Sequence, residues 1–419
     1  MVKKVVIVGA GFGGLQSAKT LGGDPNYLVT LIDRRNYHLF QPLLYQVAMA
    51  GLSSTDIAVP IRSLVSKYRN ISVILESIEH INFAEQRITG KVSVYPYDYL
   101  ILACGAKHSY FGNQKWEPNA PGLKTLEQAI EIRRRILTAF ELAERESDDT
   151  ALKQHLTFVV IGGGPTGVEL AGAIGEISRF TLSKDFQNIN PSSARIILVE
   201  ASDRILSSFD PFLSEKAMLS LKKLGVEIWL NSRVTAVSDI GVQIDNHFLQ
   251  AKTVLWAAGV QPSSLNEEIS TEKDSQGRIK VEKDLTLTEY PNVFLVGDQI
   301  SFLDKKGNTL PGIAPVAIQQ GRYVGQLLRK KARGKAMPGF EYIDKGQMAT
   351  IGRKMAVLQV GRIKLWGFPA WLAWLFIHIY YLIGFKNRFF VFIQWTWHYI
   401  SYGRGARLII DRNWRSYKK

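Results

Sequence analysis

Short apolar runs that end in glycine recur along the chain and predict buried strands. Uninterrupted apolar runs bounded by turn residues are typical of parallel strands that are covered on both faces. The two clearest runs each lead through a glycine-rich turn into a segment of small residues, which we expect to be helical. The runs span residues 5–8, 97–103, 158–161, 254–258 and 293–296. Because predicted strands and helices alternate, we expect an α/β fold built on parallel sheets.

The two glycine-rich turns share the spacing GxGxxG. The first glycine permits a tight turn from strand to helix, the second lets a pyrophosphate approach the backbone, and the third lets the helix pack on the strand. The pyrophosphate would lie at the N-terminus of the helix, where free N–H groups favour negative charge. The glycines are Gly9, Gly11 and Gly14 in the first turn and Gly162, Gly164 and Gly167 in the second. Two such units predict two bound dinucleotides, and hence redox chemistry in which electrons pass from one to the other.

An acidic residue follows the second predicted strand of each unit and is expected to bind a ribose hydroxyl. Asp33 stands at the usual distance of about 20 residues from the first set of glycines. Glu200 follows a longer stretch, whose extra residues 177–193 we interpret as a longer helix and a loop closed by Pro191. A carboxylate at this position would repel a 2′-phosphate, so Glu200 favours NADH, although Arg204 nearby keeps NADPH an alternative.

Further features fit a flavin at the first site. In flavoproteins with two dinucleotide sites, the N-terminal site usually binds FAD and the central site binds the nicotinamide nucleotide. Asp298 follows a predicted strand and Gly297, where its carboxylate would bind the ribityl chain of the flavin or a water on its phosphates. The N-terminus of the helix expected over residues 314–321 would stabilise negative charge on the reduced flavin ring.

The single cysteine, Cys104, limits the possible chemistry. One cysteine excludes an intrachain disulfide and a redox-active pair, which argues against dithiol–disulfide reductases and sulfide oxidases. We expect Cys104 to be a small buried residue. The basic N-terminus resembles a signal peptide, but the apolar run that follows is too short, so we expect the chain to stay on the cytoplasmic side. No metal-ligand cluster is evident among the seven histidines.

Positive charge is concentrated towards the C-terminus. The net charge is +15 at pH 7, and residues 345–419 contribute 13 Lys and Arg against the single acid Asp411, a net of +12. Two uncharged runs rich in Trp and Tyr, residues 365–385 and 389–403, are interrupted and followed by basic residues. These are Lys386, Arg388, Arg404, Arg407, Arg412, Arg415, Lys418 and Lys419. The pattern is typical of a bilayer interface, where aromatic rings lie at headgroup depth and cations meet anionic lipid. A nucleic-acid partner is not expected, because the basic residues alternate with apolar runs.

The first uncharged run could lie in the membrane interface or cross the bilayer. Pro369 is expected to begin a helix and Gly384 to end it, which leaves about 16 helical residues, or ~24 Å at ~1.5 Å each. That length falls short of a hydrocarbon core about 30 Å thick. We therefore favour in-plane attachment, with a membrane span and a buried dimer interface as the alternatives.

These features together resemble the type II (single-subunit, non-pumping) NADH:quinone oxidoreductases. The resemblance covers nearly the whole chain and rests on residues 36–46 (NYHLFQPLLYQ), the second glycine-rich unit, residues 179–191, Gly297-Asp298 and the helix start at 314–320. It implies an α/β fold of two Rossmann-like dinucleotide-binding domains, as in glutathione reductase, with FAD held non-covalently and a C-terminal membrane-associating helical region. It also implies ping-pong chemistry, in which NADH gives hydride to the flavin and a quinone then takes two electrons and two protons, without proton pumping.

The resemblance implies roles for individual residues. Glu169 matches the acidic residue near the nicotinamide and the flavin, and Gln319 matches the second glutamine of the family's AQxAxQ quinone motif. Pro315 replaces the first glutamine and removes one expected quinone contact. Residues 38–46 are expected to line the flavin and quinone pocket, with packing as the alternative. The residues expected to bind the cofactors are Gly9, Gly11, Phe12, Gly13, Gly14, Asp33, Arg34, Pro42, Cys104, Gly105, Gly297, Asp298 and Ala317 for FAD, and Gly162, Gly164, Gly167, Glu200 and Gly259 for NADH.

We expect an FAD-binding domain over residues 1–120 and 265–335, an NADH-binding domain over 121–264 and a membrane-attachment domain over 336–419. A homodimer is expected, located on the cytoplasmic side of the inner membrane or on the equivalent organellar face. Two other functions remain open. One is a soluble NAD(P)H-dependent reductase of a protein electron carrier, and the other is a redox-sensing flavoprotein.

Overall fold

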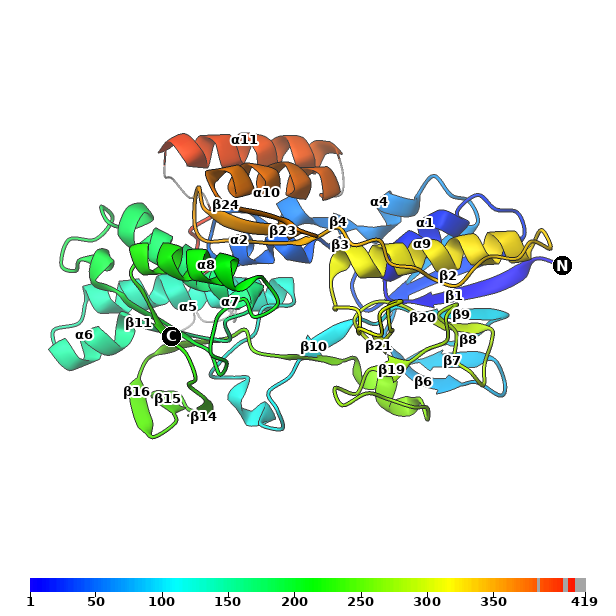
Figure 1. Cartoon of the computed structure of the whole chain (residues 1–419), viewed down its shortest axis with the longest axis horizontal. Helices are drawn as coiled ribbons and strands as arrows, with labels where there is room; N and C mark the ends of the chain where they lie inside the picture. Colours follow the sequence, from blue (N-terminus) through cyan, green and yellow to red (C-terminus); the bar gives the residue numbers. More distant parts are fainter. Residues whose placement is uncertain (383–384, 402–405, 411–419) are drawn as a thin grey trace. The chain divides into compact units, whose positions relative to one another are not determined.

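The first parallel sheet combines N-terminal strands with one strand from far along the chain (Figure 1). The computed structural model describes residues 1–382, 385–401 and 406–410. The strand order is β20-β9-β1-β2-β5. The strands are β1 (Lys3–Val8), β2 (Tyr27–Asp33), β5 (Ile71–Leu75), β9 (Tyr99–Leu102) and β20 (Val293–Leu295). The apolar run at residues 5–8 is buried throughout β1, as expected for a strand that is covered on both faces.

Helices α1 (Phe12–Leu21) and α9 (Ala314–Lys331) pack closely against each other. A Cβ on Gly321 would stand 2.1 Å from the carbonyl oxygen of Gly13, so the two backbones meet only because the side chain is absent. The Ser17 hydroxyl donates a hydrogen bond to the Gly321 carbonyl oxygen at 3.0 Å. Small residues in these helices therefore serve close helix–helix packing.

Shorter elements complete this part of the molecule. They comprise an antiparallel sheet of β6 (Ile78–Asn82), β7 (Arg87–Gly90) and β8 (Val94–Pro96), the pair β3 (Tyr37–Leu39) and β4 (Ala58–Pro60), the pair β19 (Ile279–Lys280) and β21 (Ile300–Ser301), and helix α4 (Ile61–Val65). Strand β3 contains His38 and brings it to the first glycine-rich turn.

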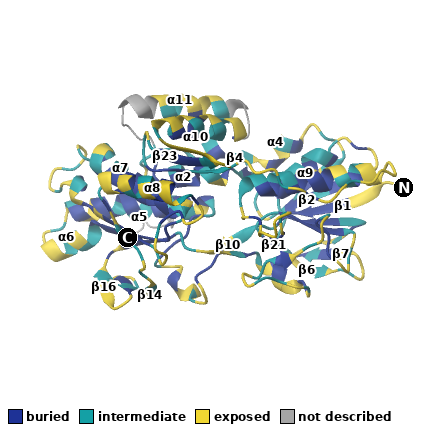
Figure 2. Ribbon diagram, in the orientation of Figure 1, coloured by how far each residue is buried: buried dark blue, intermediate teal, exposed yellow. Residues whose placement is uncertain are grey.

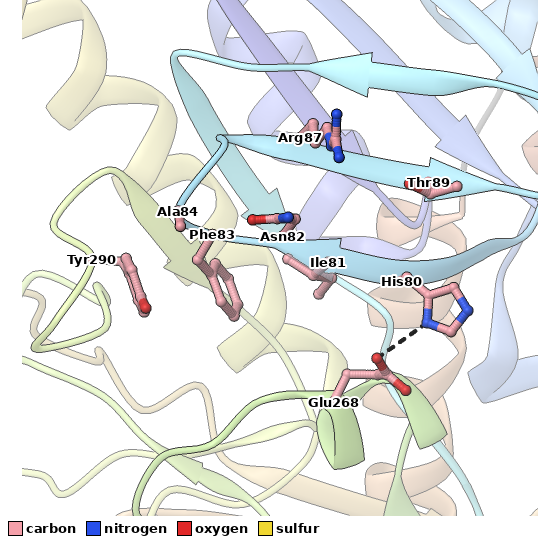
Figure 3. Close-up of a pocket in the computed structure, with 9 residues that line it drawn as sticks. All are labelled: His80, Ile81, Asn82, Phe83, Ala84, Arg87, Thr89, Glu268 and Tyr290. Atoms are coloured by element: carbon pink, nitrogen blue, oxygen red, sulfur yellow. Dashed lines mark hydrogen bonds and ion pairs between the residues drawn. The ribbon is translucent and has the colours of Figure 1, made fainter.

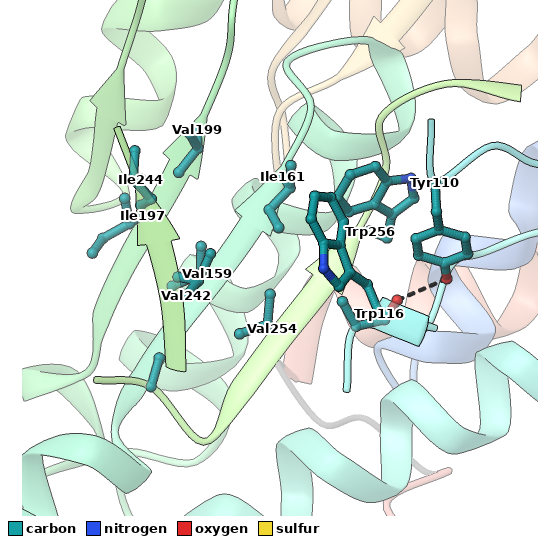
Figure 4. Close-up of a cluster of buried hydrophobic side chains, with 12 residues drawn as sticks. Tyr110, Trp116, Val159, Ile161, Ile197, Val199, Val242, Ile244, Val254 and Trp256 are labelled. Carbon is teal, nitrogen blue, oxygen red and sulfur yellow. Dashed lines mark hydrogen bonds between the residues drawn. The ribbon is translucent and has the colours of Figure 1, made fainter. Parts of the chain in front are cut away.

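The second parallel sheet has the strand order β13-β12-β11-β17. Its strands are β11 (Thr157–Ile161), β12 (Arg195–Val199), β13 (Val226–Trp229) and β17 (Thr253–Trp256), and its helices include α5 (Leu126–Glu144), α7 (Pro165–Glu176) and α8 (Pro211–Lys223). An antiparallel sheet follows, made of β14 (Val234–Val237), β15 (Gly241–Ile244) and β16 (His247–Gln250). Figure 4 shows the shared core, in which Trp256 packs against Tyr110 and Trp116. The Trp256 indole N–H is satisfied by the Ser109 carbonyl oxygen at 2.9 Å.

The extra length predicted over residues 177–193 consists of a helical extension and a loop. The extension is a π-helix at Ile177–Thr181, and Pro191 begins a short 3-10 helix at Pro191–Ser193. The carboxylate of Glu144 accepts backbone N–H bonds from Gln187, Asn188 and Ile189 at 2.9–3.2 Å. Glu144 therefore anchors the loop.

The C-terminal part forms a three-stranded antiparallel sheet followed by two helices. The strands are β22 (Gln347–Thr350), β23 (Ala356–Val360) and β24 (Ile363–Gly367), and the helices are α10 (Phe368–Tyr381) and α11 (Phe385–Ser401). Helix α10 has Pro369 in its first turn, as the sequence predicts. Figure 2 shows exposed residues along both helices, together with buried positions on α10.

The chain divides into two compact units. The first unit contains residues 1–39, 58–107 and 260–343, and the second contains residues 40–57, 108–259 and 344–419. Residues 40–57, which include helices α2 (Leu44–Ala48) and α3 (Ser54–Ile57), thus group with the second glycine-rich turn. The FAD, NADH and membrane-attachment domains assigned above stay predictions.

The last glycine of the second fingerprint, Gly167, generates a test of the fold. A Cβ at this position would stand 1.7 Å from the Gly162 carbonyl oxygen, whereas a Cβ on Gly164 would meet no atom within 4 Å. We expect Gly167→Ala to lower the free energy of unfolding by about 1–3 kcal/mol, because strand and helix must move apart. The matched control Gly164→Ala is expected to stay within about 0.5 kcal/mol of the parent protein. Urea denaturation followed by circular dichroism measures both, and equal stabilities would contradict this account.

Candidate active site

The first glycine-rich turn is supported by Asp33. One carboxylate oxygen of Asp33 accepts the Ala10 N–H at 2.6 Å, and the other accepts the Arg35 N–H at 2.8 Å. Gly9 has a positive φ of 97°, which permits the tight turn. Helix α1 begins after Gly11, which provides no side-chain cap, and a Cβ on Gly11 would meet no atom within 4 Å. The turn therefore leaves backbone room beside a helix N-terminus, as a pyrophosphate requires.

The second turn repeats this arrangement around Glu200. One of its carboxylate oxygens accepts the Gly163 N–H at 2.5 Å, and the other accepts the Ser202 N–H and hydroxyl at 2.8 and 2.7 Å. Gly162 has a φ of 107°, and Gly164 again faces open space at an uncapped helix start. The spacing of the residues along the sequence does not reveal that each acidic residue also braces its own turn. A carboxylate has about four lone-pair sites, so a ribose hydroxyl can still bind it.

His38 is a buried residue that contacts the first turn. Its Nδ1 lies 2.8 Å from the Ala10 carbonyl oxygen, and its ring meets Phe12 edge-on at 5.2 Å. Because a carbonyl oxygen only accepts, Nδ1 carries the hydrogen. Burial lowers the pKa of His38 to about 4, so the ring is neutral at pH 7. Its Nε2 is then a buried acceptor, and it has no hydrogen-bond partner among the described residues.

The remaining residues predicted to bind FAD lie mostly in the first unit. They are Gly13, Gly14, Arg34, Cys104, Gly105, Gly297, Asp298 and Ala317, whereas Pro42 lies in the second unit. The Gly297 N–H donates to the side-chain oxygen of Gln320 at 2.7 Å, which fixes the strand end near α9. Gln320 was not predicted, although a buried polar residue on a helix is the kind of signal that could have revealed it.

Cys104 is unsuited to thiolate chemistry. Its sulfur lies 3.9 Å from the Val8 carbonyl oxygen, and desolvation raises the pKa of the thiol to about 12. A thiol that remains protonated at neutral pH is a poor nucleophile. Cys104 is half-buried rather than fully buried as expected, and its protonated thiol suits a packing residue.

Glu169 lies on helix α7, in the second unit, next to strand β22. Its Oε1 faces the Thr350 backbone N–H across 3.5 Å. Desolvation raises the pKa of Glu169 to about 8, and the contact with Thr350 opposes that rise. At pH 7 the carboxyl group is therefore mostly protonated, and it ionises as the pH passes about 8. A group with this property can exchange protons under physiological conditions.

The other predicted residues of the two sites are placed as follows. Gln319, in the first unit, uses its side-chain amide to bind Ile343 twice, donating to its carbonyl oxygen at 2.9 Å and accepting its N–H at 3.0 Å. Pro315 lies in the first turn of the same helix, α9. Gly259, in the second unit, has a φ of 79° and lies beside the ring of Phe111. The cofactor and quinone roles of these residues stay predictions.

Exposed apolar side chains lie along both α10 and α11. We call this surface the C-terminal apolar face; its members are Leu372, Phe376, Tyr380, Phe389, Phe390, Phe392 and Ile393. Trp374 and Val391 are buried on the inner sides of the two helices. Among the described helices, none has both the length and the apolar character needed to cross a bilayer. Residues 383–384, 402–405 and 411–419, and with them Gly384, Arg404, Arg412, Arg415, Lys418 and Lys419, lie outside the described residues, as does the side chain of Lys386.

The first unit also contains an open cavity of about 530 Å³ (Figure 3). The cavity is lined by His80, whose Nδ1 lies 3.3 Å from Glu268, and by Phe83, which stacks on Tyr290 with a centroid distance of 4.6 Å. None of the predicted site residues lines it, so it has no part in the site described above.

Comparison with known proteins agrees with this arrangement. Residues 3–321 match the pyridine nucleotide-disulphide oxidoreductase family. The chain is 42% identical to the type II NADH:quinone oxidoreductase NdhA of Mycobacterium tuberculosis, covering 98% of this chain and 90% of that protein. It is 41% identical to the type II enzyme Ndh of the same organism, with the same coverage.

A solved structure supports the fold. The structure of NDH2 from Plasmodium falciparum in complex with NADH matches with a TM-score of 0.88 at 21% identity, over 98% of this chain and 100% of that one. The predicted α/β fold with two Rossmann-like units is confirmed. The chain therefore belongs to the type II NADH:quinone oxidoreductases, within the pyridine nucleotide-disulphide oxidoreductase family.

Proposed function

We propose that this protein oxidises NADH and passes two electrons, by way of FAD, to a quinone. The observation that carries the proposal is the duplicated glycine-rich turn, each copy braced by a carboxylate and open at a helix N-terminus. The overall reaction is NADH + H⁺ + quinone → NAD⁺ + quinol. It requires no proton pumping. Membership in the type II family supports the same substrates.

The residues of the first unit fit FAD. The open space beside Gly11, the helix N-terminus at Phe12 and the strand end at Gly297-Asp298 provide places for the pyrophosphate and the ribityl chain. His38 stabilises this turn through its hydrogen bond to the Ala10 carbonyl oxygen. When bound, FAD supplies the two-electron carrier between the two substrates. NADH is assigned to the second turn, with the adenosine ribose at Glu200.

Protons are handled by the protein's own groups. Reduction of a quinone to a quinol consumes two protons, and Glu169 is a carboxyl group whose pKa of about 8 allows it to release and take up a proton near neutral pH. Gln319 is proposed to contact the quinone, because it matches the second glutamine of the family motif. Pro315 leaves this chain without the first glutamine of that motif, so any contact made there in relatives is replaced or lost.

The C-terminal apolar face is proposed to bind the membrane in the plane of the interface. Its exposed aromatic and aliphatic side chains fit the headgroup region, and the net charge of +12 over residues 345–419 favours anionic lipid. A location on the cytoplasmic side of the inner membrane, or on the equivalent organellar face, gives access to both NADH and a lipid-soluble quinone. A homodimer is proposed on the family resemblance.

Anaerobic stopped-flow spectroscopy tests the reaction. NADH is expected to bleach the flavin absorbance of the holoenzyme, and a short-chain quinone is expected to restore it in a second, separate phase. Bleaching that the quinone cannot reverse would contradict the proposal. That result would point to a protein electron carrier as the acceptor, or to a sensor that keeps its electrons.

Glu200→Gln tests the assignment of NADH to the second turn. Glutamine keeps an oxygen for the Gly163 N–H but removes the negative charge that would repel a 2′-phosphate. The ratio of kcat/KM for NADH to that for NADPH is expected to fall roughly tenfold, the scale expected for one nearby charge. Ser202→Ala is the control, because it removes one bond to Glu200 and keeps the charge. An unchanged ratio in Glu200→Gln would refute the ribose assignment.

Vesicle sedimentation tests the membrane surface. Phe376→Ser removes a side chain that is 63% exposed on α10, while Phe248→Ser changes a similarly exposed phenylalanine on β16 (49%). Burying a phenylalanine is worth about 1.5–3 kcal/mol, so Phe376→Ser is expected to lower the partition coefficient onto phosphatidylglycerol vesicles roughly tenfold or more. Phe248→Ser should bind like the parent protein. Equal loss in the two variants, or none in either, would contradict the assignment of this face.

A further inference from the structure

Two polar side chains of helix α2 connect Glu169 to the C-terminal helices. Tyr45 is buried, and its hydroxyl lies 3.0 Å from the Thr350 hydroxyl. The Gln46 side-chain N–H₂ donates to the Tyr45 oxygen at 3.0 Å. The Gln46 side-chain oxygen accepts the indole N–H of Trp395, on α11, at 2.7 Å. All of these residues and Glu169 belong to the second unit.

The indole sets the direction of this hydrogen-bond chain. An indole N–H can only donate, so the Gln46 oxygen must face Trp395 and the Gln46 nitrogen must face Tyr45. The Tyr45 oxygen then accepts from Gln46, and its one hydrogen is left for the Thr350 hydroxyl. Thr350 also presents its backbone N–H to Glu169. The donors from Trp395 to Tyr45 therefore all point towards the Thr350 hydroxyl, and a separate group of Thr350, its backbone N–H, faces the carboxyl group of Glu169.

Trp395 is held in place by other aromatic residues of the C-terminal helices. Its ring lies 5.2 Å from that of Trp374, and Trp374 stacks on His378 with a centroid distance of 4.2 Å. His378 donates from Nδ1 to the Trp374 carbonyl oxygen at 2.8 Å, and burial lowers its pKa to about 4. The ring of His378 is thus neutral at pH 7 and adds no charge near Trp395.

Few titratable groups act on this cluster. Helix α7 carries Glu169 and Glu176, and the charges of both act on Tyr45. Helix α2 contributes Tyr45, whose pKa is raised chiefly by burial, so the phenol stays protonated. Strand β22 contributes Thr350, and α11 contributes the uncharged Trp395. Helix α5 contributes the buried Arg133, whose guanidinium donates to the Val47 and Leu52 carbonyl oxygens. The Thr350 backbone N–H is therefore the neutral donor that opposes the effect of desolvation on the pKa of Glu169.

We propose that Tyr45 is a positioning residue that sets the proton affinity of Glu169 through Thr350, with Gln46 and Trp395 fixing the direction of the chain. The hydrogen bond from Tyr45 holds the Thr350 side chain, and with it the backbone N–H that faces Glu169 and favours its carboxylate form. The inference rests on the proposed function, because it gives Glu169 a tuned protonation state for quinone reduction. It also makes a residue of the C-terminal helices part of the same cluster.

Infrared difference titration of the oxidised holoenzyme measures the protonation of Glu169 without turnover. The carboxyl band is assigned with Glu169→Gln as the blank. Tyr45→Phe removes the hydrogen donated to Thr350 and is expected to raise the pKa of Glu169 by about half a unit or more. Trp395→Phe removes the indole N–H that donates to Gln46, and it is expected to raise the pKa of Glu169 by a smaller amount.

Tyr110→Phe is the matched control. Tyr110 is another buried tyrosine of the second unit, and its hydroxyl donates to the Ala120 carbonyl oxygen at 2.8 Å. Loss of the Tyr110 hydroxyl removes a buried hydrogen bond but none of those that join Trp395, Gln46, Tyr45 and Thr350. The pKa of Glu169 should therefore not change. An unchanged or lowered pKa in Tyr45→Phe, or an equal rise in Tyr110→Phe, would overturn the proposal. If Tyr45→Phe does not retain FAD, the absence of a shift in Trp395→Phe overturns it instead.

Turnover is measured in parallel to separate this inference from the proposed function. If the parent protein does not reduce quinone, the proposed function is wrong. A raised pKa of Glu169 in Tyr45→Phe would still support the link between Tyr45 and Glu169. Normal quinone turnover with no shift in either variant would defeat the link alone. A change in the pH dependence of quinone-driven flavin reoxidation in Tyr45→Phe, with the NADH step unaltered, would support both.

Discussion

The close approach of a helix to the strand before it, made possible by one missing side chain, is the constraint on which both units depend. In each unit a Cβ on the last glycine of the fingerprint would fall within 2 Å of the carbonyl oxygen of the first. The helix N-terminus can therefore stand directly above the end of the strand, where its free N–H groups face outward. The acidic residue at the end of the next strand then holds the turn in place through a backbone N–H. Packing and binding thus share the same few atoms.

The features that follow from local spacing could be predicted from the sequence. The buried runs became β1, β9, β11, β17 and β20, and the turns, the loop closed by Pro191 and the start of α10 appear where the residues indicate. These depend on backbone geometry over a few residues. Glu169 and Gln319 could be named only by family resemblance, since nothing in their immediate neighbours marks them as reactive.

The contacts that tune the candidate site could not be predicted in this way. Tyr45 meets Thr350, and Gln46 meets Trp395, across more than 300 positions of sequence. His38 and Gln320 support the first turn through buried hydrogen bonds that no motif records. Each of these depends on how separate elements pack. A pattern of residue types cannot reveal which polar side chain will face which partner.

The division of the chain between the two units has a consequence for its synthesis. The sheet of the second unit uses strands from residues 157–256 alone, whereas the sheet of the first unit pairs β9 with β20, which ends at Leu295. About 285 residues separate β1 from β20, a delay of roughly 15–60 s at about 5–20 residues per second. On the ribosome, the sheet of the second unit can therefore be completed before the sheet of the first unit receives its last strand. Strands β1, β2, β5 and β9 are all made by residue 102, so the first sheet waits only for its edge strand β20 and for helix α9, which covers α1.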